Sequence, residues 1–215
     1  MENNKNIIIT ISRQLGCGGA YIGQEIAKQL GIMYADREII NKAAEKLSST
    51  DEEIAKFDEK PLTFWQSFFQ NSAAISNIYI PPQIVNPIDF ELFETEADIM
   101  RNMAKSNSAV IVGRCGFYAL KDYPNHIKIF LFGSFKSRCR RIEKLYKISN
   151  LEAEKMILKS DKDRSEHCSH FTGTDFYDVR NYDLAINTTN KDIDKIAELI
   201  VNYVKMVLDC ECYKK

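Results

Sequence analysis

A short apolar run followed at once by a cluster of glycines is the feature that most constrains this chain. Residues 7–11 read Ile-Ile-Ile-Thr-Ile, and β-branched residues at this density predict a strand buried on both faces. The turn Gly16-Cys17-Gly18-Gly19 comes next. Apolar residues then recur at helical spacing from Ile22 to Leu30, and Gly31 suits the end of that helix.

A strand, a glycine-rich turn and a helix in this order are typical of a phosphate-binding loop. Glycines let backbone N–H groups converge on an anion, and the helix N-terminus adds a partial positive charge. The alternative is an ordinary tight turn between strand and helix, but three glycines in four residues exceed what such a turn needs. Compared with G-x-x-x-x-G-K-[ST], Gly19 stands in place of the lysine and Ala20 in place of the hydroxyl. Arg13 is the nearest cation that could substitute, unless it pairs with a carboxylate and only fixes the turn.

Composition limits the classes of function. The chain has 215 residues, 45% hydrophobic and 27% charged, which suits one soluble globular domain. A net charge of −1 argues against nucleic-acid binding, and no apolar run is long enough for a membrane span. Six cysteines without a C-x-x-C pair indicate reduced thiols and a cytoplasmic protein. His167-Cys168-Ser169-His170 with Cys210 and Cys212 fits no standard zinc spacing, so no metal site is expected.

Further apolar runs predict an α/β fold with a five-stranded parallel sheet covered by helices on both faces. They occupy residues 32–35, 108–112, 126–132 and 182–188. Polar residues that follow such strands face the ligand crevice at the carboxyl edge of the sheet. Arg37 and Arg114 stand at such positions, and Asp36 is either a ligand or the N-cap of the next helix.

Three other segments carry expectations of their own. Residues 48–106 do not alternate strand and helix, and they predict a helical insert whose aromatic stripe is core or a homodimer contact rather than a base-stacking platform. A helix after Ser134 carries several basic residues, Arg138 and Arg141 among them, which are expected to be a solvated face. The next helix should start with a Ser149 capping box and end near Arg164, followed by a mobile polar segment over residues 165–181.

Several blocks of the sequence, taken in order, resemble the cytidylate kinase-like family. They span nearly the whole chain, and they are 9–13 with the glycine turn, 34–40, 110–114, 161–164, 172–173 and 181–188. The resemblance implies a P-loop kinase-type three-layer fold in a single domain over residues 1–215. It implies a core of residues 1–47 and 107–215, a nucleoside-monophosphate-binding insert over 48–106, and a basic lid over 159–181.

The resemblance also implies phosphorylation of a CMP-like nucleoside monophosphate with ATP and Mg²⁺. The residues that would bind the donor phosphates are Gly16, Cys17, Gly18 and Gly19. Those that would face the acceptor nucleotide are Asp36, Arg37 and Arg114. The cations that would act on the transferring group are Arg13, Lys162 and Arg164.

Three departures from the family pattern keep a second class of function open. Gly19 and Ala20 remove two loop side chains, and Cys115 replaces the acid of the family's Gly-Arg-Asp motif. The alternative is a non-catalytic nucleotide-binding sensor on the same fold.

Overall fold

A computed structural model of the chain describes residues 6–37, 40 and 90–209. Within these residues the strands are β1 (Ile8–Arg13), β2 (Met33–Asp36), β3 (Ala109–Val112), β4 (His126–Phe132) and β5 (Leu184–Asn187). The α-helices are α1 (Gly19–Leu30), α4 (Phe90–Ser106), α5 (Gly116–Ala119), α6 (Phe135–Tyr146), α7 (Asn150–Thr172) and α8 (Ile193–Asp209). A 3₁₀ turn covers Val179–Asn181.

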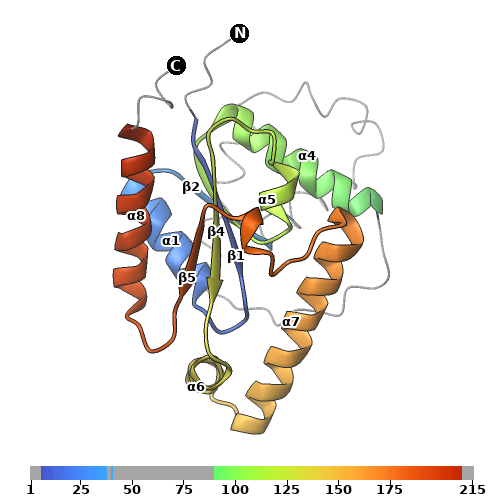
Figure 1. The fold of residues 1–215 in the computed structure, drawn as a ribbon, viewed down its shortest axis with the longest axis vertical. Coiled ribbons are helices and arrows are strands. Elements are labelled where there is room, and N and C mark those ends of the chain that lie inside the picture. Colours follow the sequence, from blue (N-terminus) through green and yellow to red (C-terminus); the bar gives the residue numbers. More distant parts are fainter. Residues whose placement is uncertain (1–5, 38–39, 41–89, 210–215) are drawn as a thin grey trace.

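The predicted five-stranded parallel sheet is confirmed. Its order is β2-β3-β1-β4-β5, and each pair of neighbouring strands is parallel. Helices α1 and α8 pack together on one face, while α4 and α5 cover the other (Figure 1). β1 lies in the centre, and five of its six residues are buried, as its apolar sequence requires. The chain leaves β1 towards β2 and leaves β4 in the opposite direction towards β5, so a crevice is expected at the carboxyl ends of these strands.

Helix α7 is longer than the sequence predicts. The expectation that it ends near Arg164 is wrong, because it continues to Thr172 and Gly173 ends it with a φ of +66°. Its start is as predicted, since Ser149 and Glu152 form a capping box. Residues 165–172 are mostly polar, and their apolar members, Cys168 and Phe171, are too few to give a helical repeat, which is why the apolar pattern misses these turns.

The two helices that flank the core bury most of the apolar residues that recur at helical spacing. On α8 the residues Ile196, Ala197, Ile200, Val201 and Val204 are buried, while Ile193, which the same pattern marks as inward, is only half-buried. On α4 the residues Phe93, Ala97, Met100 and Ala104 are buried, but Phe90 is 54% exposed and packs against the rings of His170 and Phe171 on α7. Glu96, a charged residue that the pattern does not mark as inward, is 1% exposed.

Some expectations fall on residues outside those described. They are the helix after Asp36, the aromatic part of the insert with its homodimer contact, and the two C-terminal cysteines, Cys210 and Cys212. None of the described helices combines the length and the apolar character needed to cross a membrane.

Candidate functional site

The glycine turn lies at the carboxyl edge of the sheet, directly after the central strand. Gly18 is the N-cap of α1 with a φ of +79°, and it has no side chain to cap the helix. The first N–H groups of a helix have no partner within it. In the described part of the chain, the N–H groups of Gly19, Ala20 and Tyr21 have no acceptor. They form a group of donors that an oxyanion can satisfy.

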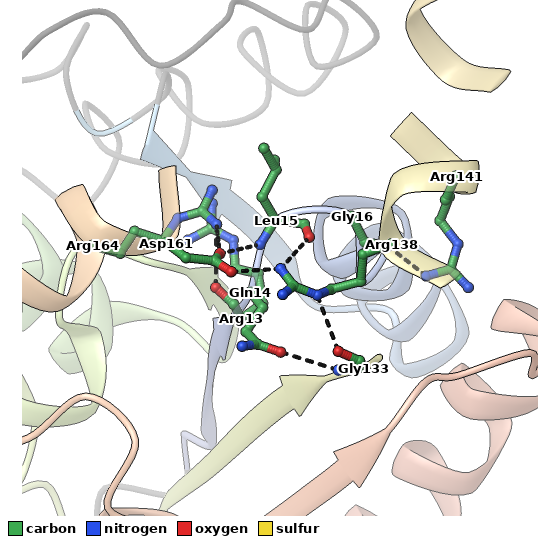
Figure 2. A network of polar contacts seen from close by, with 9 residues as sticks. All are labelled: Arg13, Gln14, Leu15, Gly16, Gly133, Arg138, Arg141, Asp161 and Arg164. Carbon is green, nitrogen blue, oxygen red and sulfur yellow. Dashed lines mark hydrogen bonds and ion pairs between the residues drawn. The ribbon is translucent and has the colours of Figure 1, made fainter. Parts of the chain in front are cut away.

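Three arginines from α6 and α7 hold the carbonyl groups of this loop (Figure 2). Arg138 donates from Nη1 to the Leu15 carbonyl at 3.1 Å, and Arg141 donates from Nη1 to the Gly16 carbonyl at 2.5 Å. Arg164 donates to the carbonyl of Arg13, the last residue of β1, at 3.3 Å. Because the carbonyls are bound to guanidinium groups, the loop backbone is fixed before any ligand arrives.

Asp161 of α7 connects these arginines to the loop (Figure 2). Its Oδ1 accepts from the Leu15 N–H at 2.9 Å, and its Oδ2 pairs with Arg138 at 2.5 Å. The longer contact to Arg164 is 3.9 Å. The side chains of Arg138 and Asp161 are 7% and 14% exposed, so this is a desolvated pair.

The expectation of a solvated basic face on α6 is therefore wrong for two of its arginines. Arg138 is buried, and Arg141 is partly buried against Gly16 and Thr188. Arg138 can be buried because the Leu15 carbonyl and the Asp161 carboxylate replace the water that it loses, and the Gly16 and Thr188 carbonyls do the same for the partly buried Arg141. A run of charges on one helix carries no sign of such distant partners.

Arg13 points across the mouth of the loop. A Cβ on Gly19 would lie 2.8 Å from the Arg13 Cγ, and a Cβ on Gly113 would overlap its Nη1. Glycine at both positions thus makes room for this side chain, which occupies the space where a lysine at position 19 would start. Within residues 6–37, 40 and 90–209, the guanidinium has no hydrogen bond or ion pair. Desolvation and the nearby Arg164 lower the pKa of Arg13 to about 9, so it remains charged at neutral pH.

A second cationic group lies at the ends of β2 and β3. Arg37 and Arg114 are close enough for the charge of Arg37 to lower the pKa of Arg114, although desolvation lowers it more. The Arg114 Nη2 is 2.6 Å from the Glu96 Oε1, and both side chains are less than a tenth exposed. Burial raises the pKa of Glu96 to about 6 despite the two arginines. The charges of Arg37 and Arg114 therefore act on each other, and the Glu96 carboxylate that pairs with Arg114 was not foreseen from the sequence.

Of the remaining predicted residues, some lie at the loop and one lies on the exposed side of α7. Asp36 accepts a hydrogen bond from the Tyr34 hydroxyl at 3.1 Å, and its charge acts on Arg13. Cys17 is buried in the turn. Lys162 lies on the exposed side of α7 and pairs with Glu166 at 3.6 Å, so the structure does not bring it to Arg13 and Arg164.

Cys115 directs its side chain into the interior instead of towards a ligand. It lies in a buried aromatic cluster that also contains Cys168 of α7. The neighbouring Cys168 thiol and burial raise the pKa of the Cys115 thiol. In the described residues, no group of three or more His, Cys, Asp or Glu side chains is placed to hold a metal ion.

Sequence reasoning missed Asp161, Arg138 and Glu96 as parts of the site. Asp161 belongs to a recognised block of the sequence, which is the one signal that pointed to it. Glu96 gives a weaker signal, because it lies among buried positions of an amphipathic helix.

The sequence of this chain is similar to those of proteins called cytidylate kinase. A model described as the cytidylate kinase-like family matches residues 8–190. A protein called cytidylate kinase from Sulfurisphaera tokodaii is 27% identical over 203 residues, which cover 94% of this chain and 97% of that protein. Another cytidylate kinase, from Saccharolobus islandicus (strain Y.G.57.14 / Yellowstone #1), is 30% identical over 137 residues, 64% of this chain and 66% of that one.

Solved structures give the fold. An uncharacterized protein from Eubacterium ventriosum has a TM-score of 0.69 and 26% identity, with 94% of this chain and 99% of that chain covered. A shikimate kinase from Acinetobacter baumannii has a TM-score of 0.50 and 11% identity over 95% of this chain and 96% of that one. A gluconokinase from Sinorhizobium meliloti has a TM-score of 0.50 and 12% identity over 94% of this chain and 93% of that one. These neighbours identify the P-loop kinase-type fold that the sequence predicts.

Proposed function

The chain belongs to the cytidylate kinase-like family, and we propose that it transfers the γ-phosphoryl group of ATP to a CMP-like nucleoside monophosphate. One observation carries the proposal: the guanidinium of Arg13 lies beside the first N–H groups of α1, and among the described residues neither the guanidinium nor these N–H groups have a hydrogen-bond partner. A desolvated guanidinium such as that of Arg13 is stabilised by an anion, and a polyphosphate bound at the loop would be that anion.

The donor site would combine backbone and side-chain groups. The N–H groups of Gly19 and Ala20 would bind phosphate oxygens, while Arg13 would lie over them in place of the loop lysine. The planar guanidinium binds two oxygens at once, which suits both binding and the charge that develops during transfer. Arg164, held at the Arg13 carbonyl, is the second cation close enough to act on the transferring group.

The residues of the loop fit ATP better than they fit a directly bound metal ion. Ala20 has no oxygen to offer, so Mg²⁺ would be held by the phosphates and by water. When bound with ATP, the ion would neutralise charge between the β- and γ-phosphates. The chain itself would orient the donor through the loop and exclude water through α7.

The acceptor would bind on the neighbouring cationic group. Arg37 and Arg114 follow β2 and β3, next to the end of β1, so a phosphate between them would lie near the donor loop. Glu96 fixes the Arg114 side chain by the 2.6 Å contact, and this pre-orients it for a phosphate. Asp36, beside Arg13, would face the same nucleotide.

A second function is supported by the loop itself. Gly19 and Ala20 lack the two side chains that usually act on the γ-phosphate and its metal, and Asp161 already binds the Leu15 N–H. A nucleotide-binding sensor that opens and closes without turnover would use the same fold.

The experiment that separates these functions measures product and binding together. The protein is incubated with ATP, Mg²⁺ and each of CMP, UMP, AMP and GMP, and nucleoside diphosphates are separated by anion-exchange chromatography. Thermal unfolding is recorded with the same mixtures. Diphosphate formed from CMP supports the kinase, and a stabilised protein without product supports the sensor. Absence of both product and stabilisation would rule out both functions.

A further inference from the structure

His167 is a residue of the acceptor region that neither the motif nor the fold assigns. It lies on α7, and its ring packs on Phe171 at 4.7 Å and on Phe93 of α4 at 6.0 Å between centroids. Its Nε2 is buried and has no hydrogen-bond partner among the residues that the structure describes. Buried polar atoms are nearly always satisfied, so an orphan ring nitrogen beside a binding site needs an explanation.

In the described part of the chain, three titratable groups act on this ring, and a fourth, Glu96, is linked to it through Arg114. Arg37 follows β2, Arg114 follows β3, Glu96 on α4 is paired with Arg114, and His170 lies one turn away on α7. Burial and then the two arginines lower the pKa of His167 to about 4, so without a ligand the ring is neutral at pH 7. Among the described residues, neither arginine forms a hydrogen bond with Nε2 of this neutral ring.

We propose that His167 takes up a proton when the acceptor's phosphate binds at Arg37 and Arg114, and that its Nε2–H then bonds a phosphate oxygen. The proton comes from solvent, and the ring becomes the third cation of the acceptor site. This inference rests on the acceptor site proposed above.

The charge of a bound phosphate is large enough to bring the pKa of His167 close to neutral pH. A single negative charge at about 4 Å in an effective dielectric of about 20 raises a pKa by about three units. That change moves the pKa of His167 from about 4 to near 7. The gain in affinity is therefore present below about pH 7 and is lost as the pH rises above it.

The test is calorimetry of ligand binding in two buffers that differ in ionisation enthalpy. CMP and inorganic phosphate are the two probes, and wild type is compared with His167→Gln at pH 6, 7 and 8. We expect uptake of about half a proton per ligand at pH 7, lost in the variant. The phosphate's own proton, with a pKa of about 6, cancels in the comparison of the two proteins. The affinity difference should be about tenfold at pH 6 and less than about twofold at pH 8.

His170→Gln is the matched control, because His170 is exposed on the same helix. The chain has three histidines, so ¹⁵N NMR of the imidazole rings reads the protonation of His167 directly in wild type. That measurement remains available if His167→Gln does not fold.

The outcomes separate the inference about His167 from the proposed function. Ligand binding without His167-dependent proton uptake overturns the inference and leaves the proposed function intact. If phosphate binds with that uptake but CMP does not bind, the inference holds and the proposed acceptor is wrong. If neither probe binds, both fall.

Discussion

Arg13→Met should make the unliganded protein more stable and the nucleotide complex weaker. Methionine keeps an aliphatic stem over Gly19 and removes the charge. In the described residues this charge has no ion-pair partner, and its desolvation lowers the pKa of Arg13 from 12.5 to about 9.

The expected change in the free energy of unfolding follows from the lowered pKa of Arg13. A group whose folded-state pKa is lowered is destabilising in its protonated form, which for Arg13 is the form present at all pH values below about 9. The full change corresponds to an upper limit of about 5 kcal/mol. Arg13 is only partly buried, so solvent reduces this, and we expect a gain of about 1–2 kcal/mol in the free energy of unfolding. Loss of a charged hydrogen bond to phosphate should weaken ATP binding by about 1.5–3 kcal/mol.

The assay pairs urea unfolding at pH 7 with calorimetric titration of ATP. Lys28→Gln is the control, because it removes the same charge from an exposed side chain on α1. If Arg13→Met is less stable than wild type and binds ATP equally well, Arg13 only fixes the turn and the reasoning fails.

Three further predictions concern the loop and the core. Asp161→Asn should lower the free energy of unfolding by about 3 kcal/mol, because it leaves the buried Arg138 charge without its carboxylate. Urea unfolding measures this change, and an unchanged free energy would show that the ion pair of Arg138 with Asp161 does not stabilise the fold. Gly19→Lys restores the usual loop lysine, but the new side chain would contact the Arg13 Cγ and displace Arg13. The rate of nucleoside monophosphate phosphorylation should therefore fall at least about tenfold, and a higher rate would refute the idea that Arg13 replaces the loop lysine. His126 bonds Thr10 and the Leu120 carbonyl, and burial lowers the pKa of His126 to about 4. Stability should therefore be lost as the pH falls from 6.5 towards 4, and His126→Gln should flatten that profile in urea unfolding.

The sequence by itself determined the elements whose signals are local. The strand at His126–Phe132 is where its apolar run predicts, and the capping box at Ser149 starts α7 as expected. The glycine turn is the start of α1 for the same reason, since backbone geometry and cap chemistry depend on residues a few positions apart. Parallel pairing of the strands also follows, because runs buried on both faces need helices between them.

Tertiary structure decided which charges enter the site. Arg138 and Asp161 are 23 residues apart, and Arg13 and Gly113 lie on different strand ends. Nothing in a local pattern marks a basic residue on a polar helix as buried, because its burial depends on a distant carbonyl or carboxylate that replaces water. For the same reason the sequence predicts Arg13 as the substitute cation, but only the packed chain shows that Gly19 and Gly113 leave it room and that no described carboxylate forms an ion pair with it.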